Sequence, residues 1–286
     1  MRIRRAESLE ELSAVLADYS TGHLFRGQAQ HYTTDSGNPS IVSSFSRKGC
    51  TPETTRKWTF WAQLVLDLLG APFDENLGMA LMQHYGWRSF YVDVTSDTAV
   101  AAWFAAHKLQ VTQAFDLPQH LSVVMEHEIG NYSLADGDVS LYVFNIDEVQ
   151  RHGYSVENLA TYLTDPSCRP VRQRAWAMGP LNRFNPTLNP SCIAARVVAP
   201  VSVMQGYAAS HGLWSPADLF PPPERDFVLA FLEQQPWINT AENAYVRSFR
   251  YPNYHGAPRS LSEIDLDERR INNLQAKTHR RLSVSC

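Results

Sequence analysis

The stretch QHYGWRSFYVDVTSDTAVAAWFAAHK, residues 83–108, constrains the fold more than any other part of the chain. From Phe90 to Thr95, apolar and polar residues alternate, which is the pattern of a strand with two unlike faces. Thr95 or Ser96 can then act as a helix N-cap, and Asp97 suits the positive first turn. Apolar residues recur at helical spacing as far as His107. The stretch therefore predicts a strand, a tight turn and a helix, with polar side chains where free backbone N–H groups can receive a ligand.

Similar patterns place further elements along the chain. Helices are expected over 6–16, 51–70, 75–85, 155–163, 223–235 and from residue 262 onward. Strands are expected at 24–25 and over 121–129, 138–147 and 192–199. We therefore expect an α+β fold in which a mixed sheet core carries packed helices over residues 1–238. A helical C-terminal extension, 239–286, is expected to pack on this domain or to contact a partner.

Composition narrows the class of protein. A hydrophobic content of 44% in 286 residues supports a well-buried core. The four cysteines are scattered, which favours reduced thiols over a disulfide framework. A net charge of −4 offers no general attraction to nucleic acid or anionic membrane. The charged opening MRIRRAESLEEL and the lack of a long apolar run predict a cytoplasmic protein without a membrane partner.

A second polar feature, HLFRGQ, lies far upstream of the first. Arg26, Gly27 and Gln28 directly follow the short strand expected at 24–25. The arginine fork suits a phosphate or a carboxylate, and glycine lets a ligand approach the backbone closely. An arginine in an internal ion pair is the alternative for Arg26.

Three motifs in order, LFRGQ, LMQHYGWRSFYVDVTSDTAVAAWFAA and HGLWSPADLFP, resemble the FRG domain family from about Ser8 to Glu233. The central motif is Gln-His-Tyr-Gly, a strand ending in Asp, then Thr-Ser and a helix with Ala and Phe-Ala. The matching residues are Gln83, His84, Tyr85, Gly86, Asp93, Thr95, Ser96, Ala101, Phe104 and Ala105. The chain departs from the family pattern at Arg88, Ser89 and Phe90, at Val94 and at Trp176. These departures concern the chemistry more than the fold.

The order of Arg-Gly on a first strand and Ser on a strand-to-helix turn is also similar to ADP-ribosyltransferases, more distantly. The resemblance implies NAD as the substrate and no metal. It implies that Arg26 and Gln28 hold NAD and that the Gly27 backbone pairs with the nicotinamide amide. Tyr85 would then stack on the nicotinamide ring, and Ser96 or Thr95 would fix its ribose.

Cleavage of the glycosidic bond of NAD develops positive charge on the sugar, which calls for a nearby carboxylate. Asp93 is a candidate by its position. Glu126 and Glu128 in MEHE are candidates because they would project from the same face of one strand, although such a pair is more typical of a solvated strand face. Glu224 is more simply an acid in the first turn of a helix.

His84 has two interpretations. It can act as a general base or ribose-binding residue, or it can be a buried histidine that donates to Asp93 and holds the turn rigid. The other histidines lack metal-ligand spacing on one element, so no metal site is expected.

The leading functional hypothesis is an NAD-using ADP-ribosyltransferase or NAD hydrolase that acts as a bacterial toxin or defence effector. Its partner would be a protein or nucleic-acid acceptor of ADP-ribose, or a regulatory antitoxin. The alternatives are a non-catalytic module that binds a nucleotide or a partner, and a metal-independent nuclease built on His84 and Asp93.

Overall fold

A computed structural model describes residues 1–45, 63, 66–67, 70, 74–85, 89–116, 125–163, 165–181, 186–234 and 245–252. Its strands are β1 (Arg2–Arg5), β2 (His23–Gln28), β3 (Val92–Thr95), β4 (His107–Asp116), β5 (Met125–Leu134), β6 (Asp138–Asn145), β7 (Ser155–Asn158), β8 (Ala175–Gly179), β9 (Ile193–Pro200) and β10 (Tyr245–Pro252). Its helices are α1 (Leu9–Ala17), α4 (Glu75–His84), α5 (Thr98–Ala106), α6 (Ile146–Arg151), α7 (Arg169–Arg172), α8 (Val201–Ser210), α9 (Pro216–Leu219) and α10 (Phe227–Gln234). Two 3₁₀ turns, η1 (Leu159–Thr161) and η2 (Pro190–Cys192), complete the described elements.

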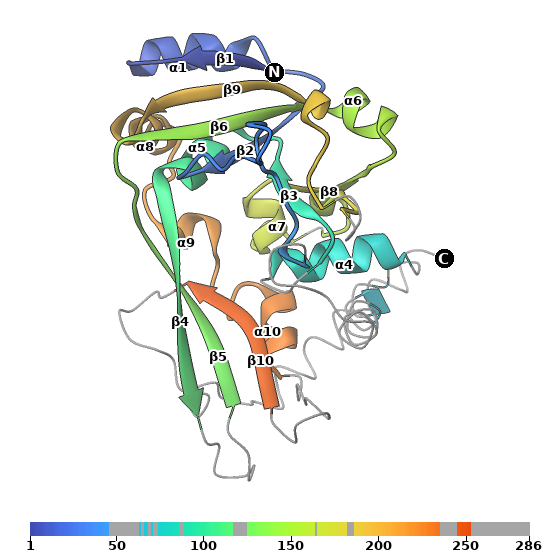
Figure 1. Cartoon of the computed structure of the whole chain (residues 1–286). Coiled ribbons are helices and arrows are strands. Elements are labelled where there is room, and N and C mark those ends of the chain that lie inside the picture. The colour runs from blue at the N-terminus through green and yellow to red at the C-terminus, as the bar shows by residue number, and fades with distance from the viewer. Residues whose placement is uncertain are drawn as a thin grey trace.

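Seven strands form one mixed sheet in the order β1-β9-β6-β2-β3-β8-β7. The pair β1 and β9 is parallel, and the other neighbours are antiparallel. Strands β4, β5 and β10 form a separate sheet that extends away from the larger one (Figure 1). The expected α+β class with a mixed sheet and packed helices is therefore confirmed.

Both faces of the seven-stranded sheet are buried over much of their area. On one face, alternate residues of β2, β6 and β9 pack under α1, α5 and α8, with Trp103 as the largest fully buried side chain. Farther along this face, α4, α7 and α10 pack on β8 around Tyr85 and Tyr91. On the opposite face, Val92 and Val94 join a core with Tyr142 and Phe144. This two-sided burial explains why the strand at β3 carries so few exposed residues.

Helix α5 buries almost its whole surface, because alanine recurs along it and lets it lie close to β2 and α8. Its N-cap is Asp97, whose side chain accepts hydrogen bonds from the backbone N–H groups of Ala99 and Val100. The expectation that Thr95 or Ser96 caps this helix is wrong. Thr95 instead accepts from the N–H of Asp97, and so shapes the turn just before the cap.

Most other expected elements are found where the structure describes them. Ser8 caps α1 as expected, with its side chain accepting from Glu11 N–H. A helix was expected over 155–163. This prediction is wrong for the first half of the segment, which forms the edge strand β7 paired with β8. Most of the helix expected over 51–70 lies outside the described residues.

The C-terminal extension also differs from expectation. Tyr245–Pro252 is a strand that pairs in parallel with β5, so the helical expectation is wrong for these residues. The helix expected from Ser262 lies outside the described residues.

Candidate functional site

The neighbouring strands β2 and β3 separate almost as soon as they meet. In the described chain they share one registered pair, Phe25 with Thr95, whereas β2 pairs with β6 along its whole length. Just past that pair, the Arg26 guanidinium Nη1 donates to the backbone carbonyl of Asp93 at 2.5 Å. The arginine side chain therefore links two strands at a place where a ladder hydrogen bond would otherwise be expected.

Asp93 lies at the centre of this split. Its Oδ2 accepts from Gln83 Nε2 at 3.1 Å, and its Oδ1 lies 3.9 Å from His84 Nδ1. Burial acts most strongly and would raise the pKa of Asp93, but the nearby His84, Arg26 and Gln83 together hold this pKa below its usual value. The Asp93 side chain as a whole is 37% exposed although its Oδ1 is buried, so the ionised carboxylate is only partly open to solvent.

The C-terminal end of α4 is held in place on both sides of this carboxylate. Gln83 Oε1 accepts from the hydroxyls of Ser44 and Ser89, at 2.7 and 3.1 Å, which leaves its amide N–H to face Asp93. The backbone carbonyl of His84 accepts from Arg169 Nη1 at 3.3 Å. These contacts fix the orientation of Gln83 and His84.

The structure favours the positioning role for His84. Its side chain is only 5% exposed, and in the described part of the chain its Nε2 has no hydrogen-bond partner. A buried ring with its one close polar neighbour at Asp93 is better placed to orient that carboxylate than to collect a proton from bulk water.

Tyr85 does not join the site. Its ring is fully buried, and its hydroxyl lies 2.9 Å from both carboxylate oxygens of Asp226. The guanidinium of Arg169 lies 4.9 Å from the Tyr85 ring centroid. Asp226 also accepts from the backbone N–H groups of Val228 and Leu229 at the start of α10. The acid that stabilises the first turn of this helix is therefore Asp226 and not the expected Glu224, which is exposed. The expected stacking of Tyr85 on nicotinamide is therefore wrong for this structure.

Gly27 serves packing and not ligand approach on the face toward α5. A Cβ there would lie 2.0 Å from the Ala101 carbonyl oxygen and 2.2 Å from the Ala105 backbone nitrogen. Glycine is required because the helix backbone comes against the strand at this position. The expected role of Gly27 is corrected accordingly.

The Thr-Ser pair divides between burial and solvent. Thr95 is buried, and its hydroxyl donates to the Gln173 carbonyl at 2.7 Å. Ser96 is exposed, and its backbone N–H donates to the Arg174 carbonyl. Within the described chain, neither hydroxyl forms a hydrogen bond with the Asp93 carboxylate.

The remaining candidates are Gln28, Glu126 and Glu128. Gln28 ends β2, and within the described residues its buried Oε1 lacks a hydrogen-bond partner. Glu126 and Glu128 belong to the first half of β5, in the three-stranded sheet, at the end that extends away from β2 (Figure 1). The structure thus brings Arg26 to the backbone carbonyl of Asp93 and His84 near the Asp93 carboxylate, whereas Glu126 and Glu128 belong to the other sheet.

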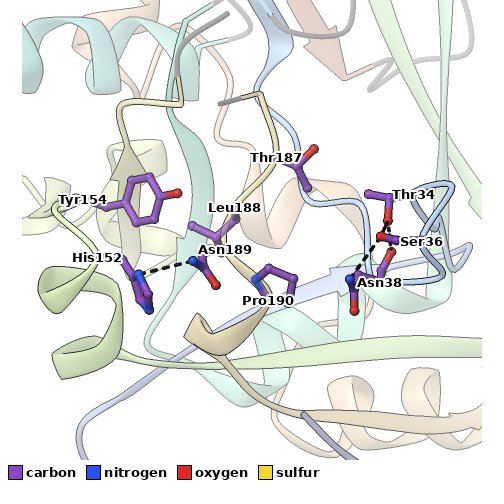
Figure 2. Close-up of a pocket in the computed structure, with 9 residues that line it drawn as sticks. All are labelled: Thr34, Ser36, Asn38, His152, Tyr154, Thr187, Leu188, Asn189 and Pro190. Carbon is purple, nitrogen blue, oxygen red and sulfur yellow. Dashed lines mark hydrogen bonds between the residues drawn. The ribbon is translucent and has the colours of Figure 1, made fainter. Parts of the chain in front are cut away.

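A separate cavity of about 420 Å³ lies between the loop after β2, the end of α6 and the loop before β9 (Figure 2). It is lined by Thr34, Ser36, Asn38, His152, Tyr154, Thr187, Leu188, Asn189 and Pro190. None of these was a candidate site residue from the sequence, and the available signal was a polar run in the loop after β2. Its lining is polar but carries no carboxylate, lysine or arginine.

His152 and Ser191 beside this cavity look like a nucleophile and its base, with Oγ 2.6 Å from Nε2. The surrounding hydrogen bonds point the other way. Ser191 Oγ donates to Asn189 Oδ1 at 2.8 Å, and Asn189 Nδ2 lies 3.3 Å from His152 Nδ1. If the amide donates to Nδ1, the imidazole proton is on Nε2 and is directed at Ser191, so the histidine is not placed to accept a proton from it. The trio is therefore a closed capping network at η2.

The described residues contain no group of three or more His, Cys, Asp or Glu side chains placed to hold a metal ion. None of their helices combines the length and the apolar character needed to cross a bilayer. Comparison of the chain with protein-family models, curated proteins and solved structures gave no match.

Proposed function

We propose that the protein binds NAD in the split between β2 and β3 and cleaves its nicotinamide glycosidic bond, as an ADP-ribosyltransferase or an NAD hydrolase. The observation that carries the proposal is the convergence of Arg26, His84 and Asp93 from three different elements. The FRG-like and transferase-like motifs support the choice of NAD among nucleotides.

The reaction breaks the bond between C1′ of the ribose and the nicotinamide nitrogen, and the bonding electrons leave with nicotinamide. Asp93 supplies the carboxylate that this step needs, because its low pKa keeps it charged beside the developing positive charge. Water or an acceptor nucleophile then adds to C1′ and loses a proton. His84 holds the carboxylate in place from its buried position.

Arg26 is the proposed contact to the NAD phosphates. A guanidinium carries five N–H donors in a planar fork, a geometry that suits the several acceptor oxygens of a phosphate. The partner of a transferase would be a protein or nucleic-acid acceptor, and a toxin or defence effector would also be held by an inhibitory partner.

A non-catalytic nucleotide-binding module is the second candidate. It is favoured because three of the residues expected to bind NAD serve the fold. Gly27 packs against α5, and the hydroxyls of Tyr85 and Thr95 form internal hydrogen bonds. A binding site needs Arg26 and the open side of Asp93 but does not need those three residues at the ligand.

The experiment compares wild type with Asp93→Asn and Arg26→Ala. Binding is measured by calorimetry at millimolar NAD, and nicotinamide release is measured by chromatography. Loss of turnover in Asp93→Asn with binding kept would support the enzyme. Asp136→Asn is the matched control, since Asp136 is an exposed aspartate paired with Lys108. Binding without turnover in wild type would favour the binding module, and neither binding nor turnover by folded wild type, tested with candidate acceptors, would refute the use of NAD.

A further inference from the structure

Two arginines flank one tyrosine across the middle of the large sheet. In the strand register, Arg26 of β2 lies opposite Tyr142 of β6, and Tyr142 lies opposite Arg196 of β9. Paired residues point to the same face of a sheet, and strands lie about 4.8 Å apart, so the two arginine backbones are about 10 Å apart with the tyrosine between them. Both side chains are long enough to approach the Tyr142 hydroxyl.

His31 completes this group from the loop after β2. Its Nδ1 lies 2.5 Å from the hydroxyl of Tyr142, whose side chain is fully buried. The ring centroids of His31 and Tyr142 are 6.2 Å apart. Burial and then the charge of Arg196 lower the pKa of His31. If Tyr142 donates to Nδ1, the outer nitrogen of His31 carries the proton and is a donor.

Arg196 lacks the carboxylate partner that several other arginines of the described chain have. Arg4, Arg5 and Arg151 each form an ion pair with a carboxylate. Arg196 is half-buried, its Nε donates to Ser140 Oγ at 2.9 Å, and no carboxylate of the described chain forms an ion pair with it. Within the described residues its two terminal nitrogens, with four N–H donors, form no hydrogen bond or ion pair and can donate to a ligand.

The row is open to solvent at one end. Ile3 of β1 is the next residue in register beyond Arg196, and it is 63% exposed. A ligand can therefore reach Arg196 from the β1 side, while β2 and the loop that bears His31 bound the other side.

We propose that Arg196, His31 and Tyr142, with Arg26 beside them, form a binding site for a phosphate group, either free phosphate or the phosphate of a nucleotide. The donors here are a guanidinium fork, an imidazole N–H and a nearby second guanidinium, and this set matches an anion with several acceptor oxygens. Arg196 is a half-buried cation that forms no ion pair within the described residues, and a bound phosphate would supply the opposite charge. The proposal does not depend on NAD or on Asp93.

The test is calorimetric titration with inorganic phosphate and, separately, with ADP, at low ionic strength. Arg196→Gln is expected to weaken binding by about ten- to a hundredfold, because a charge-assisted contact is lost. Arg151→Gln is the matched control, with the same change of charge on an exposed helix, and is expected to bind as wild type does. Tighter binding of ADP than of phosphate would assign the site to a nucleotide, and equal binding would assign it to phosphate itself.

A second readout follows His31 directly by NMR. Phosphate should raise the pKa of this imidazole in wild type, and the shift should be smaller in Arg196→Gln. Circular dichroism shows whether the variant is folded. The proposal is overturned if folded wild type binds neither ligand at millimolar concentration, or if Arg196→Gln binds both as wild type does. Nicotinamide release is measured separately with Asp93→Asn, so failure of one proposal leaves the other to be judged by its own assay.

Discussion

Replacement of Gly27 by alanine is the sharpest test of how the sheet and α5 fit together. The added Cβ would lie 2.0 Å from the Ala101 carbonyl oxygen, about 1.4 Å short of ordinary contact. The atoms it meets belong to helix backbone, so no side-chain rotation can relieve the clash. The helix would have to move away from β2, and its other sides are already packed in the core.

Overpacking of a core costs about 1–3 kcal/mol of stability. A clash between a strand residue and the backbone of a packed helix is expected to cost an amount at the upper end of this range. A loss of about 3 kcal/mol lowers the Tm of a domain of this size by about 6–12 °C. Thermal unfolding followed by circular dichroism measures this shift. Gly206→Ala is the matched control, because its Cβ would meet only the flexible Leu9 side chain, at 3.3 Å, and a helical alanine is favoured over glycine. An unchanged Tm in Gly27→Ala would refute the packing explanation for this glycine.

Three further predictions concern the residues around the site. Asp97→Ala should destabilise the protein by about 1 kcal/mol through loss of the α5 cap, whereas Ser96→Ala should change urea-unfolding stability by less than about 0.5 kcal/mol; equal effects would contradict the cap assignment. Tyr85→Phe should cost about 1–3 kcal/mol in the same assay, because buried Asp226 loses a donor, and no loss would mean that the pair is not formed. Since the folded-state pKa of Asp93 is lowered, the ionised side chain stabilises the fold above the unfolded pKa and this stabilisation is lost as pH falls through the lower folded pKa. Asp93→Asn should therefore be less stable than wild type at pH 7, and the difference should shrink below about pH 4; a constant difference across pH would show that the charge of Asp93 is not what stabilises.

Local patterns in the sequence were enough to predict the strand β3, the helix α5 and the α+β class. Alternation and helical spacing depend on neighbours a few residues away, and the chain obeys them here. The helix predicted at β7 was wrong because pairing with β8 outweighs the helical signals of this segment. That partner strand lies some twenty residues farther along the chain, beyond the reach of a local pattern.

The site could be predicted only in part for a related reason. Arg26, His84 and Asp93 were chosen for their chemistry and do lie together. Tyr85 was misplaced because its partner, Asp226, is 141 residues away, and no short-range pattern reveals such a contact. Arg196 and Tyr142 were missed because each sits inside an ordinary strand pattern, and only the register sets them side by side.

The pairing of β1 with β9 has a consequence for how the chain folds during synthesis. The first strand of the protein finds its partner only after Ile193–Pro200 has been made. At about 5–20 residues per second, β1 waits about 10–40 s beside the ribosome with its pairing edge exposed. Release of a chain that stops before β9 would leave both β1 and β6 with an open edge, which favours aggregation. The sheet can therefore be completed only after β9 has been synthesised. Fragments from the first two thirds of the chain are expected to depend on chaperones to stay in solution.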